Sequence, residues 1–176
     1  LREALEVQAA QLARCPDLSV SVNLSAQSLN DPTFLPFLEG LIERSPLVPE
    51  RLCFELTETA AVTHLEAASQ VLRRLRDMGC MVALDDFGSG LSSYSYLKNL
   101  PADYLKIDGE FIRDLGRDGS DDAMVKSIHE LSHHLGKLTV AEFVETEQIR
   151  DRLRSIGLDY AQGYGIDMPV PLNQMG

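Results

Sequence analysis

The sequence lacks several features that mark common classes of protein. It has only three cysteines in 176 residues and none of them forms a CxxC pair, which indicates buried thiols in a reducing compartment. No apolar run approaches the roughly 20 residues that a membrane-spanning helix needs, and no signal peptide is visible. We therefore expect a cytoplasmic domain whose own surface makes no membrane contact, whether or not the protein that carries it is anchored in a membrane.

The sequence also has little positive charge. It has 16 basic and 27 acidic residues, which give a net charge of −11. The densest basic cluster is the trio Arg73, Arg74 and Arg76, which falls in a helical segment and is typical of a solvated face. A nucleic-acid binder usually has a basic face, so we expect neither DNA nor RNA as a partner. An acidic protein can still bind a phosphate ester when metal ions lie between them.

Along the sequence, short apolar segments typical of strands alternate with amphipathic segments typical of helices. We expect strands over residues 18–24, 52–56, 80–84, 104–107, 138–141 and 160–162. We expect helices over residues 1–14, 31–42, 66–78, 121–135 and 147–156, with a short one that ends at Leu100. Six strand-then-helix units with short turns predict a parallel sheet. The candidates are an open doubly wound sheet and a (β/α)₈ barrel.

Polar side chains help to decide between these two folds. They fall at or just beyond the C-terminal ends of the predicted strands: Asn23, Glu55, Asp85, Asp86, Lys106, Asp108, Glu142 and Gln162. In a barrel these ends converge on one mouth, whereas six spaced strands of an open sheet would not gather them. We therefore predict an α/β fold, a TIM-like (β/α)₈ barrel that is incomplete here, with residues 1–176 as one partial domain. The two further strands are most simply placed before Leu1, where the chain already begins in a helical pattern.

These polar residues would form a set of hard oxygen ligands. The oxygens come from four carboxylates and one amide: Glu55, Asp85, Asp86, Glu142 and Asn23. Crowded carboxylates repel one another unless cations neutralise them, and oxygen-rich sites suit Mg²⁺ or Mn²⁺. Two such ions about 3.5–4 Å apart would activate a water and stabilise in-line displacement at a phosphodiester. Lys106 would add a positive charge for a phosphate oxygen or for the nucleophilic water.

Taken singly, these residues have ordinary explanations. Asp85 could cap the next segment and Glu55 could be a surface charge, but apolar strands rarely all end in acids by chance. The histidines differ, because none falls at a strand end and each is typical of a helix face: His64, His129, His133 and His134. The serines Ser92 and Ser93 have no matching histidine and acid, so nucleophilic catalysis is unsupported.

Six motifs follow one another over essentially the whole chain. They are VNLS at 22–25, ELTET at 55–59, LDDFGSGLSSYSYL at 84–97, LKIDGEFI at 105–112, AEFVET at 141–146 and QGYGIDMP at 162–169. In order and spacing they resemble the EAL-domain cyclic di-GMP phosphodiesterases. The resemblance implies an eight-stranded barrel with one antiparallel strand. It also implies hydrolysis of cyclic di-GMP to linear pGpG with Mg²⁺ or Mn²⁺.

The resemblance implies a role for each residue that matches a motif. The metal ligands would be Asn23, Glu55, Asp85, Asp86 and Glu142. Lys106 would orient the catalytic water, and Glu145, with Glu142, would contact water or metal as part of the catalytic group. Gln162 and Asp108 would lie on the substrate side, with Gln162 near the guanine. Glu58 resembles the glutamate that anchors the loop over residues 86–93.

The resemblance also implies partners. In this family the loop over residues 86–93 is thought to couple dimerisation to metal binding, so we expect a homodimer. Phe143 in AEFVET and the QGYGIDMP ending resemble a branch that is fused to sensor and GGDEF domains. We therefore expect such domains upstream. A non-catalytic cyclic di-GMP receptor is the alternative function, but the motif acids that the chain can contain are all retained, which favours catalysis.

The letters EAL at residues 3–5 are not the family signature. They fall in an amphipathic helix shortly before Asn23, whereas the metal-binding EAL of the family lies on a strand well before the NLS motif. We interpret Glu3 as an ordinary surface glutamate. The true signature glutamate would then lie upstream of Leu1, and we expect the 176-residue polypeptide alone to hydrolyse cyclic di-GMP poorly.

Overall fold

The structure is a computed structural model that describes residues 1–176 except 3–4, 7–8, 17, 89–94, 118 and 172–176. The chain forms two compact units. Unit 1 contains Leu1–Ala83 and Ser95–Ala102, and unit 2 contains Leu84–Tyr94 and Asp103–Gly176. The expectations for Glu3, for Ser92 and Ser93 and for most of the loop over residues 86–93 lie outside the described residues.

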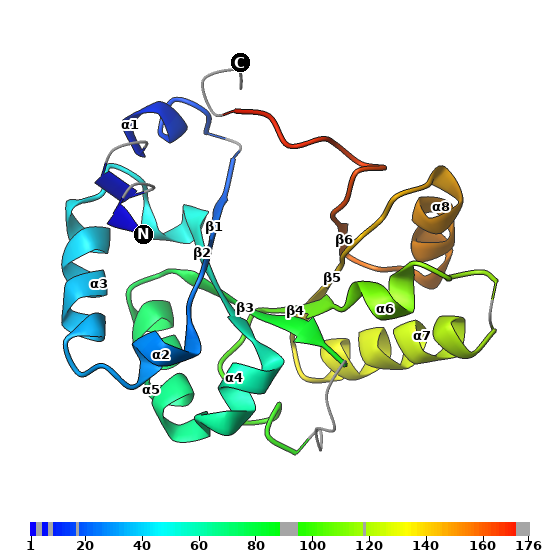
Figure 1. Ribbon diagram of the computed structural model, residues 1–176, viewed down its shortest axis with the longest axis horizontal. Helices are drawn as coiled ribbons and strands as arrows, with labels where there is room; N and C mark the ends of the chain where they lie inside the picture. Colours follow the sequence, from blue (N-terminus) through cyan, green and yellow to red (C-terminus); the bar gives the residue numbers. More distant parts are fainter. Residues whose placement is uncertain (3–4, 7–8, 17, 89–94, 118, 172–176) are drawn as a thin grey trace. The chain divides into compact units, whose positions relative to one another are not determined.

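The described residues contain a six-stranded sheet whose strands follow the order of the sequence (Figure 1). The strands are β1 (Val20–Asn23), β2 (Leu52–Thr57), β3 (Met81–Phe87), β4 (Tyr104–Ile107), β5 (Leu138–Ala141) and β6 (Tyr160–Ala161). β3 has residues 81–83 in unit 1 and residues 84–87 in unit 2. The pairings β1/β2, β4/β5 and β5/β6 are parallel. This confirms the predicted α/β fold with fewer strands than the eight of a closed barrel; the expected antiparallel strand is not among these pairings.

Helices connect the strands. They are α1 (Ala9–Leu12), α2 (Ala26–Leu29), α3 (Phe34–Arg44), α4 (Glu58–Thr63), α5 (Leu65–Asp77), α6 (Gly109–Ile112), α7 (Gly119–His134) and α8 (Glu147–Ile156), with a 3₁₀ turn at Pro49–Arg51. None of the helices in the described ranges has the length and apolar character to cross a bilayer. The predicted short helix before Leu100 is wrong, since residues 95–99 form turns. Pro101 disfavours helical backbone at Leu100, and the few residues before it give a short helix little stability.

Unit 1 has a core of apolar side chains from α3, α5 and β2. The buried residues of α5 are Ala68, Val71, Leu72 and Leu75, which repeat at the spacing of one helical face. Helix α4 follows β2 directly, and the Thr57 hydroxyl caps it by accepting a hydrogen bond from the Ala60 amide. This cap fixes the position at which the chain leaves the C-terminal end of β2.

Arg51 ties two parts of unit 1 together. Its guanidinium donates hydrogen bonds to three main-chain carbonyls, those of Leu12, Cys15 and Leu18. These carbonyls lie between the end of α1 and the start of β1, while Arg51 immediately precedes β2. The planar guanidinium can serve three acceptors at once, which an ammonium group does less well.

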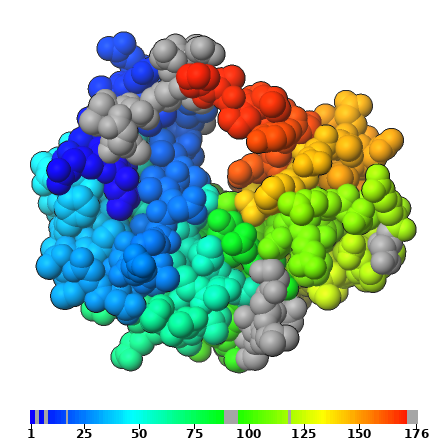
Figure 2. Space-filling model, in the orientation of Figure 1, coloured from blue at the N-terminus to red at the C-terminus, as the bar shows by residue number. Residues whose placement is uncertain are grey.

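Unit 2 has α7 packed on β4 and β5 (Figure 1). Thr146 caps α8 by accepting from the Ile149 amide, and α8 ends at Gly157 with a left-handed φ of 98°, a conformation that favours glycine. The segment after β6, drawn orange to red in Figure 2, is largely exposed. Its apolar side chains are therefore on the surface: Tyr164, Ile166, Met168 and Val170.

We predict that Arg51→Lys lowers the free energy of unfolding by about 2 kcal/mol, because charged hydrogen bonds to the three carbonyls are lost or weakened. Urea denaturation followed by circular dichroism measures the change. The matched control is Arg73→Lys on the exposed face of α5, which should stay within about 0.5 kcal/mol of the wild type. Equal effects of the two substitutions would contradict the assigned role of Arg51.

Candidate metal centre

Charged side chains from three neighbouring strands meet within unit 2. Asp85 and Asp86 lie in the last part of β3, Lys106 lies in β4, and Glu142 directly follows β5. The prediction placed Asp85 and Asp86 just after a strand, whereas β3 continues to Phe87. Because β4 and β5 are parallel, their C-terminal ends lie at the same edge of the sheet. This edge therefore gathers the four residues.

The Lys106 ammonium occupies the centre of this group. Its Nζ lies 2.8 Å from Oδ1 of Asp85 and 2.8 Å from Oε1 of Glu142. Lys106 is only 5% exposed and Glu142 is 8% exposed. Among the described residues, Asp85 Oδ1 is a buried atom that accepts no hydrogen bond of good geometry, so its contact with Lys106 is an ion pair at close range. A buried lysine is stable only when such partners compensate its lost hydration.

The group holds more negative charge than Lys106 balances. Burial raises the pKa of Glu142, the hydrogen bond and charge of Lys106 oppose that rise, and the neighbouring charges of Asp85 and Asp86 add to it. Burial also raises the pKa of Asp86, followed by repulsion from Asp85 and Asp108. Both carboxyl groups thus hold protons more tightly than usual, because burial and the neighbouring carboxylates both disfavour their charged forms.

Three carboxylates of this group fit a divalent metal ion. One oxygen from each of Asp85, Asp86 and Glu142 lies within 4.8 Å of the other two. Neighbouring oxygens around Mg²⁺ are about 3 Å apart, because each is about 2.0–2.1 Å from the ion, so small side-chain rotations would reach that geometry. An all-oxygen donor set suits Mg²⁺ or Mn²⁺. Asp85 Oδ1 accepts no well-formed hydrogen bond from the residues that the structure describes, and the pKa values of Asp86 and Glu142 are raised. Both observations indicate that a bound cation would reduce the electrostatic repulsion among these carboxylates.

The main chain is unusual at two points of the group. Asp86 and the residue after Glu142, Phe143, both have φ of 53°, which is uncommon for residues with a side chain. The Phe143 ring packs over Gly109, where an added Cβ would lie 2.2 Å from the ring. The Arg113 guanidinium carbon lies 4.5 Å from the ring centroid. Because the Phe143 ring leaves no room for a side chain there, glycine is required at position 109. The sequence analysis did not identify this packing role of Phe143.

The remaining predicted metal ligands lie together in unit 1. Asn23, the last residue of β1, is in register with Glu55 of β2, and the main chain at this point is held by the Leu24 amide, which donates to the Glu55 carbonyl at 2.7 Å. Glu55 is buried and Asn23 is exposed. The structure thus places Asn23 and Glu55 side by side, although β2 continues past Glu55 to Thr57. Their assignment as metal ligands stays a prediction.

Glu58, the predicted loop anchor, is buried in the first turn of α4. Its carboxylate accepts a hydrogen bond from the hydroxyl of Tyr96, which is also buried and comes shortly after the loop over residues 86–93. The sequence analysis assigned no role to Tyr96. A buried glutamate needs a hydrogen-bond donor, but the sequence does not show which residue provides it. The effect of Glu58 on the loop itself stays a prediction.

Glu145 and Gln162 line a small cavity of unit 2. The cavity has a volume of about 210 Å³, and its lining is Glu142, Phe143, Glu145, Gln162, Gly163 and Tyr164. A main-chain hydrogen bond, which the Val144 amide donates to the Gln162 carbonyl, holds the two segments that line the cavity together. Asp108 instead caps α6 by accepting from the Glu110 amide at 2.8 Å. The substrate roles of Gln162 and Asp108 and the catalytic role of Glu145 stay predictions.

Comparison with known proteins gives consistent matches. The family model described as EAL domain matches residues 1–169. Cyclic di-GMP phosphodiesterase PdeB of Shewanella oneidensis is 45% identical over 156 residues, 89% of this chain and 18% of that protein. Cyclic di-GMP phosphodiesterase PdeF of Escherichia coli is 40% identical over 172 residues, 98% of this chain and 23% of that protein. The chain therefore spans about a fifth of the length of these curated relatives.

A solved structure shares the fold. The PaMucR phosphodiesterase in complex with c-di-GMP matches with a TM-score of 0.89 and 35% sequence identity. The match covers 97% of this chain and 71% of that chain. It supports the interpretation of the six-stranded α/β fold as an incomplete barrel of this type.

We predict that Lys106→Met raises the pKa of Glu142 further, because the substitution removes the hydrogen bond and the positive charge that hold it down. Carbon-13 NMR titration of the glutamate carboxyls in the presence of a chelator measures this pKa. Lys98→Met, at an exposed position of unit 1, is the matched control and should leave it unchanged. An unchanged Glu142 pKa in Lys106→Met would show that the ion pair is not formed.

Proposed function

The chain belongs to the EAL domain family, and on that basis we propose that it acts as the phosphodiesterase domain of a bacterial cyclic di-GMP signalling protein. The reaction would be hydrolysis of one phosphodiester of cyclic di-GMP to give linear pGpG. The observation that carries the proposal is the buried Lys106 between Asp85 and Glu142, with Asp86 within reach of the same point. This arrangement provides both anionic metal ligands and a fixed cation for an anionic substrate.

Asp85, Asp86 and Glu142 would hold the divalent ions of the reaction, Mg²⁺ or Mn²⁺, as two ions. The family resemblance adds Asn23 and Glu55 as further ligands. When bound, such ions supply positive charge for the phosphodiester and lower the pKa of bound water. This also explains how a chain with a net charge of −11 can take an anionic substrate, since metal ions would reverse the local charge.

The protein side chains would orient the attacking water, accept its proton and contact the guanine. The Lys106 ammonium can donate a hydrogen bond to the attacking water or to a phosphate oxygen, and its two carboxylate neighbours hold it in place. Glu142, which pairs with the same ammonium, would accept a proton from that water. Gln162 in the small cavity offers both a donor and an acceptor for the edge of a guanine, and Glu145 lines the same cavity.

Partners follow from the same resemblance. We propose that the chain works as part of a homodimer and that sensor and GGDEF domains precede it in the longer protein. The buried contact between Glu58 and Tyr96 supports the loop part of this proposal, because it fixes the segment next to the loop over residues 86–93. Sedimentation of the longer protein with and without Mg²⁺ would show whether dimerisation depends on the metal.

We predict that Glu142→Gln lowers kcat for pGpG formation at least about 100-fold in the longer protein that carries this chain, because it removes a metal ligand and a proton acceptor. Chromatography of the products with Mg²⁺, and again with a chelator, measures the loss. Glu130→Gln, an exposed position on α7, is the matched control and should keep full activity. Binding of cyclic di-GMP without any turnover by the wild type would support the alternative of a non-catalytic receptor.

The 176-residue polypeptide alone is expected to form little pGpG. The family resemblance places a further metal-binding glutamate on a strand earlier than the NLS motif, and these residues do not contain that strand. Comparing its turnover with that of the longer protein tests the expectation. Turnover at the same rate by both would contradict it.

A further inference from the structure

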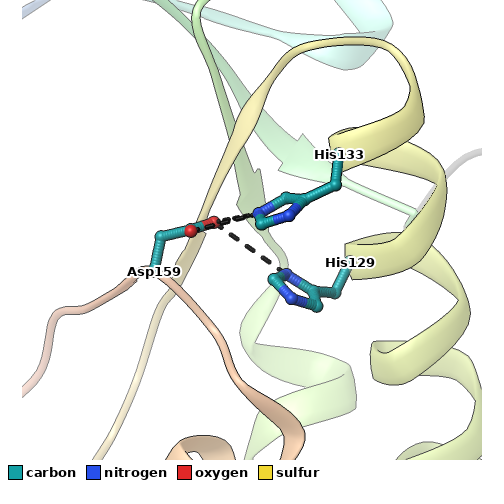
Figure 3. Close-up of side chains that lie close together, drawn as sticks. All are labelled: His129, His133 and Asp159. Carbon is teal, nitrogen blue, oxygen red and sulfur yellow. Dashed lines mark hydrogen bonds and ion pairs between the residues drawn. The ribbon is translucent and has the colours of Figure 1, made fainter.

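A second group of metal-ligating side chains lies in unit 2, apart from the carboxylates at the strand ends. His129 and His133 project from successive turns of α7 toward the carboxylate of Asp159, which precedes β6 (Figure 3). Thr139, near the start of β5, joins this group, whereas Glu142 follows the opposite end of the same strand. The two groups are therefore at opposite ends of β5.

The three side chains are already close enough to share one ion. Nε2 of His133 is 2.9 Å from Oδ2 of Asp159, and Nδ1 of His129 is 3.9 Å from the same oxygen. One ligand atom from each residue lies within 4.8 Å of the other two. Ligands around tetrahedral Zn²⁺ are about 3.3 Å apart, because each bond is about 2.0–2.1 Å long. The groups need to move by only about 1 Å to reach that geometry.

The surroundings hold the carboxylate in a fixed direction. The main-chain amide and the hydroxyl of Thr139 both lie in hydrogen-bond distance of Oδ2 of Asp159, at 2.8 and 2.9 Å. The same hydroxyl is 2.9 Å from Nδ1 of His129. Thr139 is fully buried, so its hydroxyl has little freedom. The Thr139 amide and hydroxyl are thus outer partners of Asp159, and such partners orient a metal ligand and raise its affinity. Nδ1 of His129 would give up its contact with the Thr139 hydroxyl when it binds an ion.

Spacing on α7 brings the two imidazoles to one face of the helix, because residues four apart lie one above the other. His129 is buried, while the His133 side chain is 45% exposed, which leaves a path by which an ion can enter. Two imidazoles and one carboxylate are the donor set of zinc sites with three protein ligands, and they differ from the all-oxygen set that suits Mg²⁺.

We propose that His129, His133 and Asp159 form a binding site for a borderline divalent transition-metal ion, with Zn²⁺ as its representative, separate from the carboxylate group at the strand ends. The ion takes the place of the hydrogen-bonding proton between Nε2 of His133 and Asp159, which is released to solvent, and links α7 to the segment before β6. A fourth position on the exposed side of His133 is left for water. The site does not depend on the proposed phosphodiesterase reaction, because none of its ligands belongs to that group.

The test is equilibrium dialysis of the purified chain against Zn²⁺, with Mg²⁺ in large excess to occupy the carboxylate group. The wild type should bind about one equivalent. Thr139→Val removes an outer partner and should weaken Zn²⁺ binding about 10–100-fold. His133→Ala removes a ligand and should weaken Zn²⁺ binding by more than that. The matched control His134→Ala removes the neighbouring exposed histidine of the same helix and should leave binding unchanged. Asp85→Asn should also leave it unchanged.

Thermal unfolding in the presence of a chelator checks that each variant is folded, and His133 is exposed enough for its truncation to be tolerated. Should His133→Ala nevertheless unfold, Thr139→Val decides the matter with the same measurement. Absence of Zn²⁺ binding by the wild type in excess Mg²⁺ would overturn the proposal. These side chains would then only connect α7 to the segment before β6 through hydrogen bonds. Equal losses in His133→Ala and His134→Ala, or loss in Asp85→Asn, would overturn it as well.

Discussion

The buried ammonium of Lys106 is the interaction on which the site depends. Moving a lysine from water to a position that is 5% exposed is costly, and only close anions compensate for it. Asp85 and Glu142 do so from the two strands on either side of β4. Burial nevertheless keeps the pKa of Glu142 raised, and the charges of Asp85 and Asp86 add to that rise, while Lys106 opposes it. The same carboxylates lie close enough together that they could hold a cation.

Much of this could be predicted from the sequence. Strands β4 and β5 and helix α8 have the expected bounds, because their apolar periodicity and flanking glycines are clear local signals. The acids near strand ends were recognisable, since apolar strands seldom end in charge, although β3 extends past Asp85 and Asp86 to Phe87. The contact of Glu58 with Tyr96 was not recognisable, because it joins residues that are 38 positions apart in the chain. Periodicity on one helix cannot reveal such contacts.

The histidines illustrate the same limit. Their spacing on α7 is visible in the sequence, and they were interpreted as a helix face, which is true of His134. Asp159 is 26 positions from His133, so only the return of the chain at β6 brings it to the imidazoles. Two groups of different donor chemistry then lie at opposite ends of β5, one made of oxygens and one of nitrogens with oxygen. Ligand type rather than position would determine which metal ion each group selects.

The most direct test of the central claim is anomalous diffraction from crystals of the protein soaked in Mn²⁺. An anomalous peak in direct contact with carboxylate oxygens of at least two of Asp85, Asp86 and Glu142 is the predicted result. Electron density that shows these three side chains apart from one another, or a fully occupied Mn²⁺ elsewhere with none beside them, would contradict the account.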